Sequence, residues 1–196
     1  SLLAWLEILK CNKGDEELEQ RTLNEMEQDV ERLKLIANRF SKIGSKPQRV
    51  EVNLADVIER VCSYFDSRLP TMGRKVVIKR DLADVTTQIS PDLFAWVLEN
   101  LIKNAVEAIE KRDGIIEITL RDRAKGGALV TVRDNGKGIP PAERKSVFQP
   151  GYTTKRRGWG LGLSLSKRIV EEYHGGKVYV KDSRVDVGTT FQLEVP

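Results

Sequence analysis

Five short stretches rich in glycine or polar residues follow one another in the second half of this chain. They are Glu99 to Ala105, which carries Asn100 and Asn104, then Asp134 to Ile139, the basic stretch from Phe148 to Lys155, Gly158 to Leu163, and Gly188 to Phe191. Each one alone is compatible with ordinary turn chemistry, since glycine is the usual residue wherever φ is positive. A glycine-rich turn that opens a helix also leaves backbone N–H groups free for phosphate. Together the five stretches predict an ATP pocket.

In this order the stretches resemble the N, G1, F, G2 and G3 boxes in the ATP-binding catalytic domain of sensor histidine kinases. That domain belongs to the superfamily that also holds DNA gyrase, the Hsp90 chaperones and the MutL-type repair ATPases. The resemblance covers about residues 50 to 196. It implies ATP and Mg²⁺ as cofactors, and transfer of the γ-phosphate to a histidine on a dimerisation helix and then to an aspartate of a response regulator.

The histidine that should accept the phosphate is not among the motifs. The single histidine of the chain is His174, and it lies at a predicted helix end before a glycine, where a histidine complements the helix dipole. In histidine kinases the acceptor belongs to a His-Glu-x-x-x-Pro motif on the first dimerisation helix. Residues 1–12 look like the remainder of that helix, so the acceptor is expected before Ser1. We expect this chain to bind Mg-ATP without phosphorylating itself.

Residues 1–46 are predicted to form a helical hairpin. A short apolar helix ends at the turn signal Asn12 to Asp15, and the following helix has apolar residues at alternating spacings of three and four, which is typical of bundled helices. These are Leu23, Met26, Val30, Leu33, Ala37 and Phe40. The resemblance implies a partial dimerisation and phosphotransfer unit that forms a four-helix bundle with a second copy in the intact parent. The alternative is that the hairpin caps its own ATP domain.

A proline at position 47 ends the long helix, because proline disfavours helical backbone before it and lacks an N–H donor. The second domain is therefore expected over 47–196. Within it the patterns predict strands at 50–53, 75–80, 85–90, 115–122, 128–133, 177–182 and 189–195, helices at 54–66, 91–111 and 161–173, and a lid from 140 to 160. Strands and helices do not alternate regularly, which predicts an α+β fold: a two-layer α/β sandwich with a mixed sheet and helices on one face.

Two asparagines on the helix 91–111 invite a functional explanation. Asn100 and Asn104 are four apart and so lie on one side of the helix, although asparagine is a poor helix former. Solvated residues beside a core face are the alternative. The resemblance implies that Asn104 gives its amide oxygen to Mg²⁺, that Asp134 accepts a hydrogen bond from the adenine amino group, and that Thr189 supports this contact. By itself, the segment from Asp134 would be a common hairpin turn.

The phosphate end of the pocket is expected at the turn that starts at Gly158. Neither a Walker A pattern nor a strand before these glycines is present, which excludes the P-loop and Rossmann sites. Lys155 and Arg157 are the expected catalytic residues, since phosphoryl transfer depends on electrostatics and positioning, with solvated loop cations as the alternative. The residues expected to bind nucleotide are Asn100, Asn104, Glu107, Asp134, Gly136, Gly138, Ile139, Tyr152, Thr154, Lys155, Gly158, Gly160, Leu161, Gly162, Leu163 and Thr189. Gly151 stands where family members often have a second phenylalanine, so the lid is expected to be looser.

Composition argues against nucleic acid and membrane as partners. The net charge is +4, and part of the excess lies in Lys155, Arg156 and Arg157, which suits a polyphosphate better than a long nucleic-acid track. No apolar run is long enough to cross a bilayer. Two unspaced cysteines indicate a reduced, cytoplasmic setting without a disulfide. Whether a longer parent is anchored in a membrane is not decided by this sequence.

Three other functions stay open. A hydrolytic ATPase of the same superfamily would need a water-activating glutamate at position 100, and Glu99 is one residue off that register. A nucleotide-binding interaction module without phosphotransfer would also lack an acceptor histidine. A serine kinase of the anti-sigma type would form acid-stable phosphoserine, which distinguishes it from a histidine kinase.

Overall fold

The computed structural model describes residues 7, 17–24, 26, 27, 30, 48–70, 75–110, 113–124, 126–155 and 159–196. The chain divides into two compact units, Ser1–Pro47 and Gln48–Pro196. In the first unit residues 7, 17–24, 26, 27 and 30 are helical. The rest of the predicted hairpin lies outside the described residues, so its assignment to dimerisation stays a prediction.

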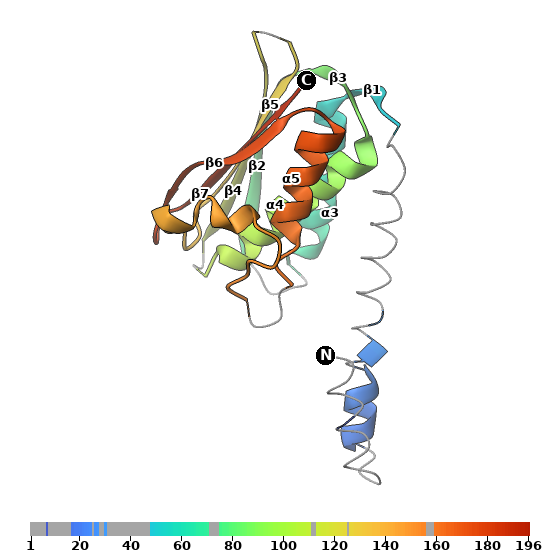
Figure 1. Ribbon diagram of the computed structural model, residues 1–196, viewed down its shortest axis with the longest axis vertical. Helices are drawn as coiled ribbons and strands as arrows, with labels where there is room; N and C mark the ends of the chain where they lie inside the picture. The colour runs from blue at the N-terminus through green and yellow to red at the C-terminus, as the bar shows by residue number, and fades with distance from the viewer. Residues whose placement is uncertain are drawn as a thin grey trace. The chain divides into compact units, whose positions relative to one another are not determined.

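The second unit is built on a mixed sheet of five strands in the order β2-β4-β5-β7-β6 (Figure 1). Strands β2 and β4 run parallel, and every other neighbouring pair in this sheet is antiparallel. The strands are β2 (Val76–Leu82), β4 (Gly114–Asp122), β5 (Ala128–Asp134), β6 (Lys177–Arg184) and β7 (Gly188–Val195). Strands β1 (Val50–Asn53) and β3 (Thr86–Ile89) form a separate antiparallel pair.

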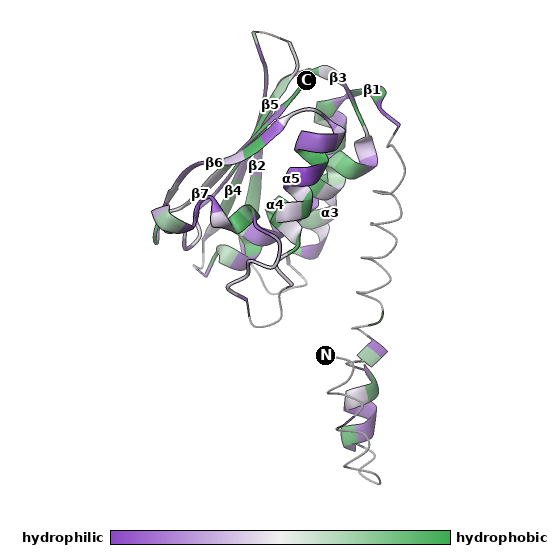
Figure 2. Ribbon diagram, viewed as in Figure 1, coloured by the Kyte–Doolittle hydropathy of each residue, from purple (hydrophilic) through white to green (hydrophobic). Residues whose placement is uncertain are grey.

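Three helices cover one face of the five-stranded sheet (Figure 1). They are α3 (Leu54–Arg68), α4 (Pro91–Ala108) and α5 (Gly162–Arg168), and α5 continues into the short π-helix η3 (Ile169–Tyr173). Their apolar faces point at the sheet, whereas polar residues dominate the outer surfaces of the helices (Figure 2). Phe94, Leu98 and Leu101 of α4 are buried in the core together with Ile118 and Val130 of the sheet. The predicted two-layer α+β sandwich is confirmed.

Helix α4 ends earlier than the sequence pattern predicted. Ile109 already has extended backbone, with φ −84° and ψ 109°, so the predicted helix end at 111 was wrong. The carbonyl of Ala108 accepts a hydrogen bond of 2.9 Å from the Lys137 N–H group. A carbonyl at a helix end needs a partner from elsewhere, and here the partner is the loop after β5. That contact joins the asparagine helix to the Asp134 segment.

His174 occupies the predicted position at the end of a helical segment. It is 1% exposed. Its Nε2 atom accepts the Ser90 N–H at 3.0 Å, and its Nδ1 atom lies 2.8 Å from the Ile169 carbonyl oxygen. Burial lowers the pKa of His174. The ring is therefore held in its neutral form, in which one nitrogen donates and the other accepts without desolvating a charge.

We expect acid to destabilise the second unit through this residue. A group whose pKa is lower in the folded state binds its proton mainly in the unfolded chain, so the stability that it contributes is lost as pH falls below the unfolded value of about 6.5. Urea denaturation from about pH 7.5 to about pH 5.5, above the range where most carboxylates titrate, measures this loss. Because the chain has one histidine, His174→Gln should flatten the profile. A flat wild-type profile would contradict the prediction.

Candidate nucleotide site

Asp134 ends β5 with its carboxylate inside the protein. It is 6% exposed, and its Oδ1 atom accepts the N–H groups of Gly136 at 2.8 Å and Thr189 at 3.3 Å. Burial raises the pKa of this carboxyl, and the two backbone donors oppose that shift. No donor in the described part of the chain bonds Oδ2. One oxygen thus holds the side chain in place, and the other keeps its lone pairs for a ligand.

Thr189 lies next to Asp134 although 55 residues separate the two in sequence. Its backbone N–H is the second donor to Asp134, and its Oγ1 atom is 2.9 Å from Oγ of Ser183. Thr189 is 4% exposed and Ser183 is 2% exposed. The structure therefore brings together the two residues predicted for the adenine end and adds a third side chain, Ser183.

The loop after Asp134 connects helix α4 to the β6–β7 hairpin. The Gly136 N–H turns back onto Asp134, and Gly138 has a φ of +73°, which favours glycine. The Ile139 N–H then donates to Ser183 Oγ at 2.8 Å. Both glycines lie close to protein backbone, since a Cβ would be 2.7 Å from the Ala108 carbonyl oxygen at Gly136 and 2.1 Å from that of Arg184 at Gly138. These approaches fix the loop beside the buried carboxylate.

Asn100 lies against the first turn of α5. Its Nδ2 atom donates to Ser166 Oγ at 2.9 Å. A Cβ placed on Gly162 would lie 2.4 Å from Asn100 Oδ1, so only glycine allows this approach. Leu161 precedes the helix as its N-cap, and Leu163 packs against the core. Asn100 therefore positions the helix start at which the phosphates are expected.

Lys155 of the lid connects to the other asparagine. Its ammonium group donates to Asn104 Oδ1 at 2.8 Å and forms an ion pair with Glu107 Oε2. Both side chains of this ion pair are partly exposed. A cation thus lies between two oxygen atoms on successive turns of α4. The other expected cation, Arg157, and the expected phosphate ligand Gly158 lie outside the described residues.

Within the described part of the chain, the predicted lid residues Tyr152 and Thr154 form no hydrogen bond with the adenine end. The Tyr152 hydroxyl donates to Glu143 Oε2, and this bond raises the pKa of Tyr152. Thr154 is exposed. The Gly160 carbonyl accepts the Gly151 N–H at 3.0 Å, which ties the two ends of the lid together. These residues shape the lid, and their contact with nucleotide stays a prediction.

Comparison with known proteins decides the family. Residues 89–196 match the family described as histidine kinase-, DNA gyrase B-, and HSP90-like ATPase. The chain belongs to this ATPase family. Every site residue predicted from the sequence lies within the matched range.

The curated relatives of this ATPase domain are much longer proteins. The sensor histidine kinase ZraS of Salmonella typhimurium is 33% identical over 74% of the chain and 30% of its own length. The C4-dicarboxylate transport sensor protein DctB of Rhizobium meliloti is 44% identical over 72% of the chain and 22% of its own length. Sporulation kinase E of Bacillus subtilis is 29% identical over the whole chain and 26% of its own length. The chain spans less than a third of each of these relatives.

Solved structures show the same ATPase fold. The nucleotide-free catalytic domain of histidine kinase ThkA is 33% identical with a TM-score of 0.66, covering 76% of this chain and 95% of that domain. ThkA in complex with the response regulator protein TrrA is 27% identical with a TM-score of 0.73. The match covers 97% of this chain and 55% of the matched chain in that complex. Among the described residues, no helix is both long and apolar enough to cross a membrane.

Sequence reasoning missed two serines that hold the ATPase site together. Ser166 accepts a hydrogen bond from Asn100. Because Ser166 follows Gly162 by four residues, the sequence could have predicted that both lie on the same face of the helix. Ser183 binds Thr189 and Ile139. No sequence pattern pointed to Ser183, because its inward direction depends on an irregularity in the pairing of β6 with β7.

Proposed function

We propose that this chain binds Mg-ATP as the catalytic part of a protein histidine kinase in a two-component pathway. The kinase would transfer the γ-phosphate of ATP to a histidine on a dimerisation helix, from which an aspartate of a response regulator receives it. The observation that carries the proposal is the Asp134 carboxylate, which is buried and which the described residues hold through one oxygen only. The relatives named sensor histidine kinases support the choice of reaction.

The adenine end follows from the chemistry of Asp134. A charged acceptor suits the exocyclic amino group of adenine, because hydrogen bonds to ionised groups are shorter and stronger than neutral ones. The Asp134 side chain is only 6% exposed, so little water reaches the carboxylate and a strong donor at Oδ2 would be favourable. An adenine amino group would supply that donor. Thr189, held against the same carboxylate through its N–H group, would complete the contact.

The phosphate end would hold Mg²⁺ between the lid and α4. Magnesium prefers oxygen ligands and takes only one or two from protein. Asn104 and Glu107 offer such oxygens, and the Lys155 ammonium between them supports a preference for positive charge at this position. Bound Mg²⁺ would neutralise phosphate charge. Lys155 would then be free to face the γ-phosphate, and Arg157 of the same lid would face it as well. The N–H groups in the first turn of α5 would contact the other phosphates.

The acceptor of the phosphate would be outside this chain's ATP-binding part. His174 is buried, and both of its ring nitrogens are engaged with backbone groups, so neither can attack a phosphate. Leu23 and Val30, two members of the predicted bundle stripe, are 50% and 39% exposed. Exposed apolar residues at this spacing support pairing with a second copy through the N-terminal helices. We place this kinase part in the cytoplasm, with a response regulator as partner.

Calorimetry followed by phosphate labelling tests the proposal. We expect the chain to bind ADP and Mg-ATP with one site, and to form no phosphoprotein with labelled ATP. A longer form of the protein that carries a histidine on the helix before this domain should gain an acid-labile, base-stable phosphoryl group. Failure to bind either nucleotide would overturn the proposal. Hydrolysis without labelling would favour an ATPase, and acid-stable label would favour a serine kinase.

Asn104→Ala should change the dependence of binding on Mg²⁺. Removing the amide oxygen takes away one expected ligand of the metal, so affinity for ATP in Mg²⁺ should fall, whereas affinity for ADP in EDTA should stay close to wild type. Lys103→Ala is the matched control, because Lys103 is the exposed neighbour on the same helix. If Asn104→Ala weakens both measurements equally, Asn104 is not a ligand of the metal.

A further inference from the structure

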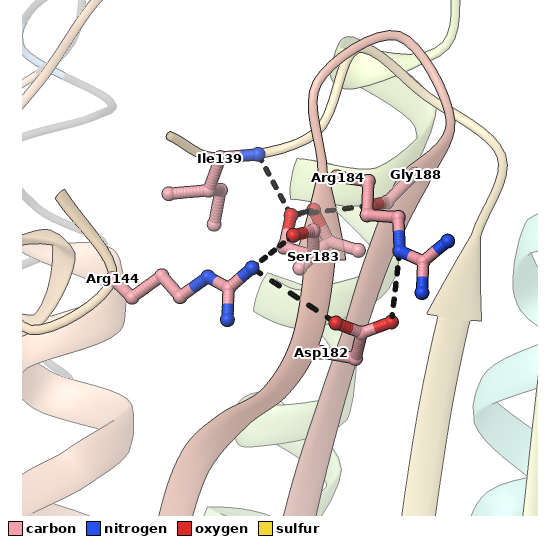
Figure 3. A network of polar contacts seen from close by, with 7 residues as sticks. Ile139, Arg144, Asp182, Ser183, Arg184 and Gly188 are labelled. Carbon is pink, nitrogen blue, oxygen red and sulfur yellow. Dashed lines mark hydrogen bonds and ion pairs between the residues drawn. The ribbon is translucent and has the colours of Figure 1, made fainter. Parts of the chain in front are cut away.

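Strand β6 carries an irregularity that turns Ser183 toward the adenine end. The pairing of β6 with β7 shifts register between Val180 and Asp182, so one residue is added on the β6 side. An extra residue reverses which face the following side chains take. As a result Ser183 is 2% exposed, whereas the side chain of Asp182 is 61% exposed and faces Arg144 (Figure 3).

The Ser183 hydroxyl has three partners, and the chemistry of two of them, Ile139 and Gly188, fixes the direction of the bond. The Ile139 N–H at 2.8 Å can only donate, and the Gly188 carbonyl at 3.1 Å can only accept (Figure 3). A serine hydroxyl has one proton and two lone pairs. If that proton goes to Gly188, the contact of 2.9 Å with Thr189 requires Thr189 to donate. All three bonds are then satisfied at once, as expected for buried groups.

This assignment determines what Thr189 offers to a ligand. When Thr189 donates its own proton to Ser183 in this way, its Oγ1 atom offers only lone pairs to a ligand. The Asp134 carboxylate, which accepts the Thr189 N–H at Oδ1, has no donor at Oδ2 among the described residues. Two neighbouring acceptors favour a base edge, or a water bound to it, that donates hydrogen bonds. They disfavour a carbonyl oxygen, which cannot donate.

The position of Ser183 is itself held from the lid side. Its backbone carbonyl accepts a hydrogen bond from Arg144 Nη2, and Arg144 also lies 3.9 Å from Asp182 (Figure 3). Arg144 directly follows the short helix η1 (Pro141–Glu143) at the beginning of the lid. The serine is therefore fixed between the loop after Asp134, the lid and the β6–β7 hairpin, and it does not depend on a bound ligand for its direction.

We propose that Ser183 is a positioning residue for recognition of the purine base: by accepting the Thr189 proton, it makes the site select a 6-amino purine over a 6-oxo purine. The inference rests on the proposed function, because it needs an adenine nucleotide at Asp134. Ser183 does not contact the base. It acts through Thr189, whose hydroxyl in its absence is free to rotate and donate to a 6-oxo group.

Calorimetry with ADP and inosine diphosphate, which has a 6-oxo group, tests the inference. Ser183→Ala should weaken ADP binding by about 3- to 10-fold, the worth of one neutral hydrogen bond, and should weaken inosine diphosphate binding less. The ratio of the two affinities should therefore fall. Partial unfolding would reduce both affinities alike and leave the ratio unchanged. Ser67→Ala is the matched control, since that hydroxyl is exposed and donates only to the Tyr64 carbonyl on α3.

A double-mutant cycle with Thr189→Val shows whether Ser183 acts through Thr189. If it does, adding Ser183→Ala to Thr189→Val changes the affinity ratio no further, because neighbouring residues in one network are not additive. Independent effects of the two substitutions would overturn the inference, as would equal weakening of both nucleotides by Ser183→Ala. Absence of ADP binding by the wild-type chain would overturn the proposed function, and this inference with it.

Discussion

Replacing Asp134 by asparagine is expected to weaken ADP and ATP alike, by about ten- to a hundred-fold, which corresponds to about 1.5 to 3 kcal/mol for a hydrogen bond to a charged group. The two backbone donors at Oδ1 fix which side of the group stays an acceptor. The amide NH₂ of asparagine would then occupy the position of Oδ2, where it faces the adenine amino group as a second donor. Both nucleotides share this contact, so the loss does not depend on the γ-phosphate.

Calorimetry with both nucleotides measures this loss, and Asp122→Asn is the matched control. Asp122 ends β4 as Asp134 ends β5, but it is exposed. The control should bind as wild type does. Asp134→Asn should also unfold at a urea concentration no lower than wild type, because burial already disfavours the charged carboxylate. Unchanged nucleotide affinity in Asp134→Asn would remove this residue from the site.

Replacing Gly188 by alanine is expected to destabilise the fold by about 2 to 6 kcal/mol. Steric overlap and backbone strain should each contribute about 1 to 3 kcal/mol. Gly188 has a φ of +142°, and a Cβ there would lie 2.0 Å from the Asp134 carbonyl oxygen. Backbone cannot rotate away as a side chain can. Any relief must shift the segment that carries Asp134, so the molecules that stay folded should also bind ADP more weakly.

Gly126→Ala separates the two causes. Gly126 also has a positive φ, of +84°, but a Cβ there meets nothing within 4 Å. The control therefore keeps backbone strain of about 1 to 3 kcal/mol and lacks the overlap. Urea denaturation of both variants should show Gly188→Ala as clearly the less stable one, with ADP affinity retained only by Gly126→Ala. Equal stability and equal affinity of the two would show that the overlap is relieved at no cost.

Much of the fold follows from short-range patterns in the sequence. Apolar residues such as Phe94, Leu98 and Leu101 recur at helical spacing, and they are buried on the sheet side of α4 as predicted. The predicted strands agree with the observed ones to within a few residues. Such elements are predictable because the period of the side chains, 3.6 or 2, depends on neighbours in the chain.

The order of the motifs also predicted part of the site. Asp134 and Thr189 were assigned to one end of the pocket by resemblance, and the structure places the Thr189 N–H on the Asp134 carboxylate. Asn104 and Lys155 were assigned to the phosphate end, and they are hydrogen-bonded to each other. The roles of these residues toward ATP and Mg²⁺ stay predictions.

The remaining features were decided by contacts between distant segments. Strands β1 and β3 pair apart from the main sheet, and Ser183 points inward. Both features depend on which strand lies alongside. A register shift between strands is not visible in the local sequence pattern. The charge state of His174 depends on burial and on the Ser90 N–H, 84 residues away. The sequence by itself determined the elements and the chemical groups of this protein. Its tertiary structure alone decided which of those groups meet, because burial and hydrogen-bond partners are properties of the packed chain.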